Sequence, residues 1–200
     1  MSNIQYDRDG KHFFVVGSEK IEWPEIKRVV YAHHDLKIMI VWEGNRKKPV
    51  SNYRYDANSY EKALESEKNW NDRRVQEIKD YEQQCIDKCK AILENTKIGD
   101  VFYASWGFEQ TNIDYYQVVA MKGKKFSFRK IKADCDYNAH YMTGKCVPLE
   151  NEFVSEDIIE KSLSKYALFK IDSVRDIKPE PFEVVDGVKV YEKKFYSCYA

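Results

Sequence analysis

The hydrophobic pattern of the first quarter of the chain predicts short strands. Apolar and aromatic runs occur at residues 12–16, 26–31 and 36–42. Turn residues 9–10 precede the first run, and turn residues 32–35 separate the second run from the third. This alternation predicts a small antiparallel sheet in which the last two runs form a hairpin. After Lys37 the third run is apolar on both faces, with Leu36, Ile38, Ile40 and Trp42 on one face and Met39 and Val41 on the other. We therefore expect this strand to be central in the sheet or covered by a helix.

A long helix is predicted next, because residues 59–95 contain no Gly or Pro and are rich in Glu, Lys, Gln, Ala and Leu. Apolar residues recur there at steps of three and four and form a narrow stripe of Val75, Ile78, Tyr81, Cys85, Cys89, Ile92 and Leu93. Residues 62–74 are mostly charged around Trp70, so the first half of the helix is expected to be the more exposed half. The stripe should cover the N-terminal sheet, which predicts that Cys85 and Cys89 are buried and reduced.

From residue 101 onward the pattern changes to short aromatic strands, expected at residues 101–105, 114–121, 125–131, 167–171, 182–185 and 188–196. Asp186-Gly187 is a strong hairpin signal between the last two, and Lys122-Gly123-Lys124 is a weaker one. Residues 155–164 are expected to form a short helix. Together these elements predict an α+β fold. Residues 1–96 form an N-terminal antiparallel sheet with a long helix, and residues 97–200 form a small C-terminal antiparallel β-barrel-like domain.

Composition narrows the class of protein. The 200 residues are 43% hydrophobic, which is enough for a buried core, and 33 basic residues balance 33 acidic ones. The whole chain is therefore not a basic nucleic-acid binder, and any electrostatic specialisation is local. No apolar run approaches the ~18 residues of a membrane span, and residues 1–10 lack the pattern of a signal peptide. Five cysteines, an odd number, favour reduced thiols and a soluble cytoplasmic protein.

Residues 99–119 resemble a long signature. They include Gly99-Asp100, Ser105-Trp106-Gly107, Gln110-Thr111-Asn112 and Tyr116-Gln117-Val118. This run resembles the pattern GD-x-x-Y-x-SWGY-x-QTN-x-D-x-YQV of uncharacterised proteins from phages, plasmids and other mobile elements. The tail from Asp186-Gly187 to the final Tyr-Ala resembles the family's ending, DGKPVY followed by YA, with Val188-Lys189 in place of Lys-Pro and Cys198 in place of a Trp. The resemblance covers residues 99–200 and implies a mobile-element context but no activity.

Within the signature, residues 105–114 concentrate aromatic and hydrogen-bonding side chains in a connection between two predicted strands. The candidate binding residues there are Trp106, Phe108, Gln110, Asn112 and Asp114. In an alternative interpretation, Trp106 and Phe108 plug one end of a barrel while Asn112 and Asp114 bond loop amides. In a third, Glu109 and Asp114 act as acid and base, although their spacing fixes no separation between the two carboxyl groups.

A local excess of positive charge follows. Between residues 117 and 146, seven basic residues face two acidic ones: Lys122, Lys124, Lys125, Arg129, Lys130, Lys132 and Lys145 against Asp134 and Asp136. Interleaved aromatic residues make this the composition of a surface that binds single-stranded nucleic acid. Phe126 and Phe128 share a strand face and are expected in the core, which leaves Lys125, Arg129, Lys130 and Tyr137 as candidate contacts. A solvated basic face without a ligand is the alternative.

Metal and cofactor chemistry have little support in the sequence. Cys135, His140, Cys146 and Cys198 lack the close pairs typical of structural zinc sites, so no metal is expected. A nucleophilic Cys135 activated by His140 has no evident third group to orient the histidine. The phosphate-binding, dinucleotide-binding and hydrolase motifs are absent, so no cofactor is expected.

These observations predict a non-catalytic binding protein of a phage or mobile element that acts on nucleic acid or on a host protein. The competing hypothesis is a cytosolic enzyme that uses residues 106–114. A third hypothesis is a protein-interaction scaffold that uses the long helix, and it requires an exposed apolar stripe.

Overall fold

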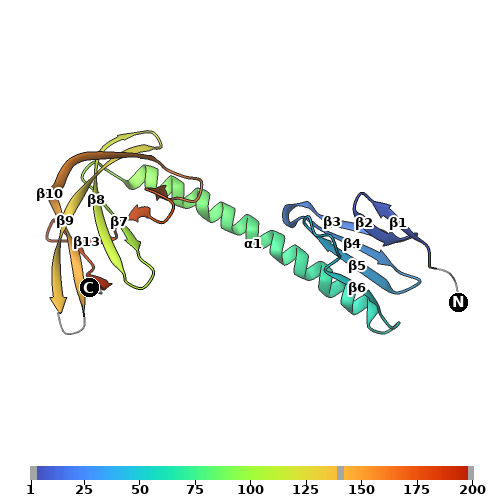
Figure 1. The fold of residues 1–200 in the computed structure, drawn as a ribbon. Helices are drawn as coiled ribbons and strands as arrows, with labels where there is room; N and C mark the ends of the chain where they lie inside the picture. Colours follow the sequence, from blue (N-terminus) through green and yellow to red (C-terminus); the bar gives the residue numbers. More distant parts are fainter. Residues whose placement is uncertain (1–3, 139–141, 198–200) are drawn as a thin grey trace. The chain divides into compact units, whose positions relative to one another are not determined.

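The computed structural model describes residues 4–138 and 142–197, in which it shows an α+β protein with one long helix and antiparallel sheets (Figure 1). The chain forms two compact units, Met1–Tyr81 and Glu82–Ala200, and helix α1 (Tyr60–Asn95) contributes residues to both. The sequence places a boundary at the end of this helix, whereas the units divide within it. In the described part of the chain, no helix is both long and apolar enough to cross a membrane.

The first unit contains a hairpin and a four-stranded antiparallel sheet. The hairpin is formed by β1 (Tyr6–Asp9) and β2 (His12–Val15), and the sheet by β3 (Glu19–Trp23), β4 (Arg28–His33), β5 (Ile38–Glu43) and β6 (Ser51–Arg54). A short 3-10 turn, η1 (Pro24–Ile26), connects β3 to β4. The strand expected at residues 36–42 forms at Ile38–Glu43. The strand order is β3-β4-β5-β6, so the prediction that this strand is central or covered by a helix is confirmed.

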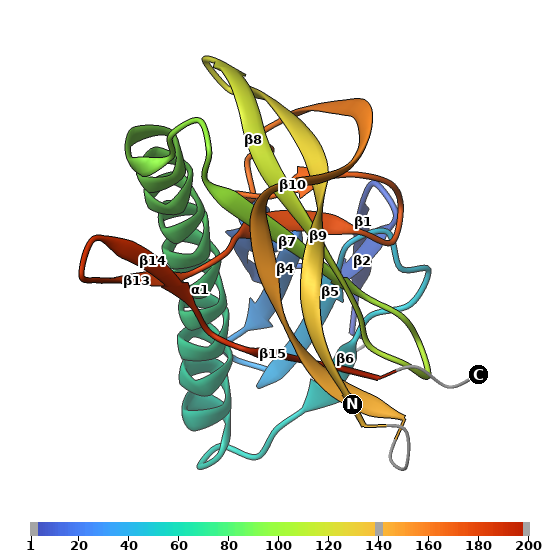
Figure 2. The ribbon, with the colours of Figure 1, turned by 90° about the vertical axis from the view of Figure 1, so that its left-hand side faces the viewer.

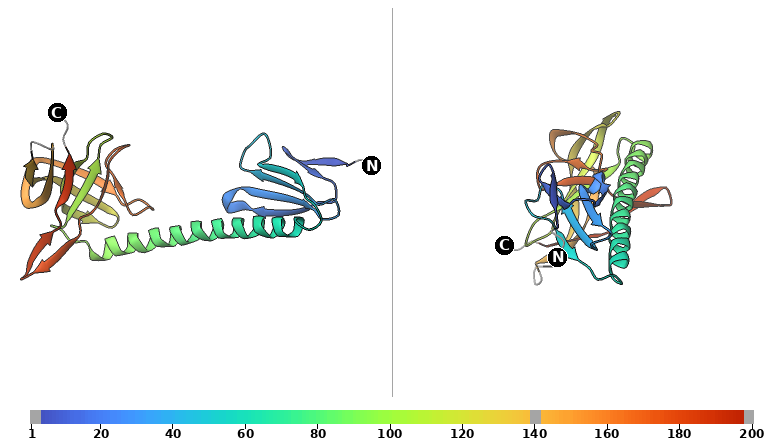
Figure 3. Two further views of the ribbon diagram at one scale, coloured as in Figure 1. Left: turned by 90° about the horizontal axis from the view of Figure 1, so that it is seen from below. Right: turned by 90° about the vertical axis from the view of Figure 1, so that its right-hand side faces the viewer.

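Both faces of the central strands β4 and β5 are buried. Val30, Ala32, Met39 and Val41 pack on one face with Tyr60 and Leu64 of α1, which lies along that face (Figure 3). On the other face, Tyr31, Ile38, Ile40 and Trp42 pack with Val15, Phe13 and Phe14 of the β1–β2 hairpin. Because successive residues of a strand point to opposite faces, a strand covered on both sides must be apolar at every position. The pattern of residues 36–42 has this cause.

Helix α1 spans nearly the predicted residues, but the expectation that its first half is the more exposed one is wrong. Tyr60, Leu64, Asn71 and Val75 are all buried. The charged pattern did not indicate this buried face, because one of the charged residues on it has a partner on the sheet. The Glu67 carboxylate lies 2.7 Å from the Arg28 guanidinium. Asn71 Nδ2 donates to the backbone oxygen of Glu67 at 2.9 Å and to its carboxylate at 3.1 Å.

The second unit is built on a seven-stranded sheet with the order β11-β12-β7-β8-β9-β10-β15. Figure 2 labels β7, β8, β9, β10 and β15 of this sheet. Its strands are β7 (Val101–Trp106), β8 (Asn112–Lys122), β9 (Lys125–Asn138), β10 (Thr143–Ser162), β11 (Phe169–Lys170), β12 (Asp176–Pro179) and β15 (Lys194–Ser197). A separate hairpin is formed by β13 (Phe182–Val185) and β14 (Val188–Tyr191). Among the described residues β11 and β15 remain the edges of the sheet, so the predicted barrel is not confirmed.

The predicted helix at residues 155–164 is wrong, because most of this segment is the end of β10. Ile158 to Ser162 pair in register with Arg129 to Lys125 of β9. The local sequence is compatible with a helix, but a neighbouring strand satisfies its backbone hydrogen bonds, and such tertiary pairing overrides a weak local preference.

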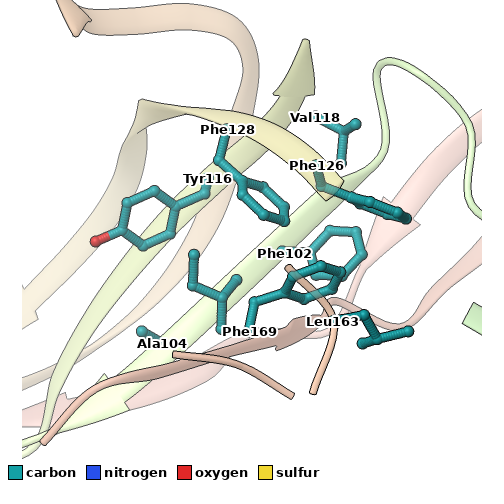
Figure 4. Packing of buried hydrophobic residues seen from close by; sticks show 9 residues of the cluster. Phe102, Ala104, Tyr116, Val118, Phe126, Phe128, Leu163 and Phe169 are labelled. Carbon is teal, nitrogen blue, oxygen red and sulfur yellow. The ribbon is translucent and has the colours of Figure 1, made fainter. Parts of the chain in front are cut away.

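Four phenylalanines form the centre of the second core (Figure 4). The rings of Phe102, Phe126, Phe128 and Phe169 lie 4.7 to 6.3 Å apart, as in edge-to-face and tilted aromatic packing. The prediction that Phe126 and Phe128 are core residues is confirmed. The apolar residues near the end of α1, including Cys89, also pack on this core, so the expectation that Cys89 covers the N-terminal sheet is wrong. Both helix cysteines are free thiols; Cys85 is buried and Cys89 is half-buried.

Candidate functional site

The candidate residues 106–114 lie at the connection between β7 and β8. Trp106 ends β7 and Asn112 begins β8, so the turn itself is residues 107–111. Gly107 has φ +126°, and a Cβ atom there would collide with the carbonyl oxygen of Gln110, so the turn requires glycine. The Thr111 N–H donates to Ser197 Oγ at 2.8 Å, and the Ser197 N–H donates to the Thr111 oxygen at 2.9 Å. These bonds fix the turn against β15.

Asp114 is the centre of a charged cluster below this turn. Its carboxylate accepts a hydrogen bond from Trp106 Nε1 at 2.8 Å and lies 2.5 Å from Lys130 Nζ and 3.6 Å from the Arg175 guanidinium. Arg175 also lies 5.5 Å from the centre of the Trp106 ring, and Asp114 is only 11% exposed. Burial and the Asp114 charge raise the pKa of neighbouring Tyr116 to about 12, so its hydroxyl keeps its proton at neutral pH. The cluster fixes the Trp106 ring in place.

Arg175 belongs to this cluster but was missed by the sequence analysis. It lies in a tight turn in which Asp172 Oδ1 accepts the N–H groups of Val174 and Arg175 at 2.9 and 2.8 Å. These donors and the Arg175 guanidinium hold the pKa of Asp172 down to about 2. An Asp two or three residues before the groups that it caps is a recognisable turn signal, but nothing in the sequence links this turn to Asp114.

Phe108 occupies the exposed part of the turn and its side chain is fully exposed. The alternative in which Phe108 plugs one end of a barrel is therefore wrong, whereas Trp106 is held against the sheet by Asp114. Gln110 and Asn112 are half-buried, and Asn112 Nδ2 is buried without a hydrogen-bond partner. A fixed turn thus presents one large aromatic ring to solvent.

The candidate basic residues on β9 are paired with carboxylates of β10. Lys125 Nζ lies 2.5 Å from Glu160, the Arg129 guanidinium 2.8 Å from Glu156, and Lys132 Nζ 3.3 Å from Glu152. Arg129 also stacks on the Phe153 ring at 3.9 Å from its centre, and Lys130 pairs with Asp114. The side chain of Tyr137 lies outside the described residues. The positive balance of the segment is thus offset by the strand beside it.

The cysteines considered for a metal or a nucleophile are placed by β9 and β10. Cys135 and Cys146 are opposite each other in the antiparallel register of these strands. Cys146 is buried, and burial raises the pKa of its thiol, which makes it a poor nucleophile at neutral pH. His140 and Cys198, the other residues of these hypotheses, lie outside the described part of the chain.

The remaining residues of the 99–119 signature bind parts of the second unit together. Gln117 is buried; its Nε2 donates to the Gly99 oxygen at 2.9 Å, and its Oε1 accepts the Asn151 N–H at 2.9 Å. Asp100 accepts the Lys97 N–H at 2.8 Å and pairs with Lys189 at 2.8 Å. The signature therefore joins the end of α1, β8, β10 and the β13–β14 hairpin.

Comparison of the chain with protein-family models, with curated proteins and with solved structures finds no match in any of the three.

Proposed function

We propose that this protein is a non-catalytic binding protein whose partner is another protein and whose main contact residue is Phe108. The supporting observation is that Phe108 is fully exposed on a turn fixed by Gly107 and by the Thr111–Ser197 bonds. A flexible loop can fold its apolar residue back, whereas this turn holds the ring in water. Burying such a ring in a partner contributes about 1.5–3 kcal/mol, and aromatic anchors of this kind dominate protein interfaces.

A protein partner has more support than a nucleic acid. Affinity for nucleic acid comes mainly from cations that replace the counterions of phosphates. Lys125, Arg129 and Lys130 each have a carboxylate partner already, so phosphate would have to displace Glu160, Glu156 or Asp114. The resemblance to mobile-element proteins favours a host protein in the cytoplasm as the partner.

The other two hypotheses have less support. For an enzyme, both oxygens of Asp114 already have partners, which suits a residue that positions Trp106 better than an acid or base. For a scaffold on α1, the large exposed apolar residues of the helix are Trp70, Tyr81 and Ile86. Trp70 and Tyr81 are separated by roughly 16 Å of helix, so they form no continuous stripe.

The test is affinity capture from a host lysate with and without nuclease, using the wild type, Phe108→Ser and, as a matched control, Tyr166→Ser. Tyr166 is another exposed aromatic residue of the second unit. We expect a nuclease-resistant partner whose affinity falls about 10- to 100-fold in Phe108→Ser and is unchanged in Tyr166→Ser. Capture that nuclease abolishes, or that Phe108→Ser leaves intact, would refute the proposal.

A direct titration with single-stranded oligonucleotides tests the nucleic-acid half separately. We expect no binding by the wild type at micromolar concentration in low salt. The triple variant Glu152→Gln, Glu156→Gln, Glu160→Gln, in which Lys132, Arg129 and Lys125 lose their partners, should bind with a salt slope of about −0.7 per phosphate contact. If the wild type binds oligonucleotides with such a salt slope, the proposal of a protein partner is refuted in favour of a nucleic acid.

A further inference from the structure

Two cysteines of the second unit are placed directly opposite each other on neighbouring strands. Cys135 of β9 pairs with Cys146 of β10, between the pairs Asp136–Lys145 and Asp134–Val147. Residues directly opposite in an antiparallel pair have Cα atoms about 4.5 or 5.5 Å apart and side chains on the same face. Both separations lie within the range of about 4.4–6.8 Å that a disulfide spans. The register of the two strands therefore gives a Cα separation that a disulfide can span.

The two thiols differ in accessibility. Cys135 is exposed, whereas Cys146 is buried. The Cys146 thiol donates to the backbone oxygen of Lys194 at 3.6 Å and lies 3.6 Å from the Tyr115 hydroxyl. A reagent in solution can reach Cys135 directly, whereas Cys146, on the neighbouring strand, is buried.

We propose that Cys135 and Cys146 form a redox-sensitive site that a small disulfide of the glutathione type converts into a cross-strand disulfide. The Cys135 thiolate attacks one sulfur of the small disulfide, so that a mixed disulfide forms and one small thiol leaves. The Cys146 thiolate then attacks the Cys135 sulfur, the protein disulfide forms, and the second small thiol leaves. Two protein thiols are oxidised and one small disulfide is reduced to two thiols.

The burial of Cys146 gives the second step a distinctive pH dependence. Burial is the largest cause of its raised pKa, the Tyr115 hydroxyl opposes this, and Cys135 and Glu180 add to it. Because only the thiolate attacks, ring closure should be slow at neutral pH and should accelerate as the pH rises toward the raised pKa. The first step, formation of the mixed disulfide on the exposed Cys135 thiol, precedes ring closure.

The chain supplies its own control pair. Cys85 and Cys89 are one helical turn apart on α1, and both are free thiols. The Cys89 thiol donates a hydrogen bond to the backbone oxygen of Ser164 at 3.3 Å. Residues at positions i and i+4 of a helix have Cβ atoms about 5–6 Å apart. This separation is too large for a disulfide unless the helix unwinds. A general reaction of all thiols would modify these residues as well.

The experiment treats the full-length protein with oxidised and reduced glutathione mixtures, alkylates the remaining thiols and maps peptides without reduction. Trypsin cleaves after Lys132, Lys145 and Lys161 and so leaves Cys135 and Cys146 on separate peptides. We expect one linked peptide pair, Cys135 with Cys146, while Cys85 and Cys89 remain alkylated. Linkage of Cys135 to another cysteine, or two separate glutathione adducts, would overturn the proposal.

Two conservative variants separate the steps. In Cys146→Ser the reaction should stop at the mixed disulfide on Cys135, and in Cys135→Ser the buried Cys146 should remain a free thiol, with modification at least about tenfold slower than that of Cys135. Circular dichroism confirms that each variant is folded. Equal modification of both cysteines in the two variants, or a rate of ring closure independent of pH, would contradict the assigned order.

Discussion

The central strands of the first unit and the β13–β14 hairpin of the second use similar residues in opposite ways. In β4 and β5, Val30 and Val41 are fully buried on the face that α1 covers, and the β1–β2 hairpin covers the opposite face. In β13 and β14, Val184, Val185, Val188 and Val190 are all exposed. The alternation of β-branched residues that forms a strand does not determine whether the strand is covered. Coverage comes from other elements.

Phenylalanines of the second unit show the same contrast. Phe128 is completely buried against Phe102 and Phe169, whereas Phe108 is fully exposed on its turn. Folding accounts for the first ring but not for the second. Apolar groups that folding leaves exposed on fixed backbone are the best places to look for contacts with other molecules.

The largest effect should come from breaking this contrast at the two phenylalanines. Phe128→Ala removes a ring from the packed aromatic core and should lower the free energy of unfolding of the second unit by about 3–5 kcal/mol. Phe108→Ala removes only exposed surface and should change it by less than about 0.5 kcal/mol. Denaturant unfolding followed by native-state hydrogen exchange of β8 and β9 measures both. A comparable loss in the two variants would mean that Phe108 is buried in solution.

The second largest effect should be a difference in how much an ion pair of each unit contributes to the free energy of unfolding. Arg28 and Glu67 are 10% and 18% exposed, and the Glu67 carboxylate also accepts a hydrogen bond from Asn71 Nδ2, so Glu67→Gln should destabilise the first unit by about 2–3 kcal/mol. Lys125 and Glu160 are more than half exposed, and Glu160→Gln should cost less than about 1 kcal/mol. Unfolding in low and in high salt completes the test, because only the exposed pair should be sensitive to salt. A salt-sensitive Arg28–Glu67 pair would show that water reaches it.

The sequence predicted α1 almost to the residue, because a Gly- and Pro-free segment with good helix formers has few alternatives. It also predicted β7, β8, the core positions Phe126 and Phe128, and the hairpin at Asp186-Gly187. It failed where a distant partner decides the outcome. Residues 155–164 became a strand because β9 pairs with them, and the polar side of α1 at Glu67 was buried because Arg28 lies opposite.

The candidate site was predictable only in part. Residues 106–114 lie at one connection between two strands, as expected. The Asp114 side chain, however, bonds Trp106 Nε1 and pairs with Lys130 where loop amides were expected as its partners, and Arg175 joins them from a distant turn. The acidic partners of Lys125 and Arg129 were not foreseen either. The β9–β10 register shifts between Pro148 and Phe153 and again between Phe153 and Ile158. Counting residues from the connection of the two strands therefore does not show which glutamate lies opposite which basic residue.

The smallest effect should be a difference in sign between the units in their response to pH. In the first unit, His12 stacks on Trp42 at 4.6 Å between ring centres, and its buried Nε2 has no hydrogen-bond partner. Burial, with Lys11, lowers the pKa of His12 below 6.5. Between that lowered pKa and 6.5 the unfolded chain binds more protons than the folded one, so stability falls as the pH falls through this window.

In the second unit, the buried Glu180 should act in the opposite direction. Lys194 Nζ lies 3.2 Å from one oxygen, but neither oxygen has a well-aligned hydrogen bond, and burial outweighs Lys194 to raise the pKa of Glu180 above 4.5. Between 4.5 and that raised pKa the folded state binds more protons, so stability falls as the pH rises. Hydrogen exchange corrected for intrinsic rates, with protected amides of β5 and β7 as reporters, follows each unit from pH 4 to 7. His12→Gln should abolish the response of β5 near pH 6 and leave β7 unchanged, and Glu180→Gln should do the reverse at lower pH. If both reporters respond to either variant, the two groups do not act within their own units.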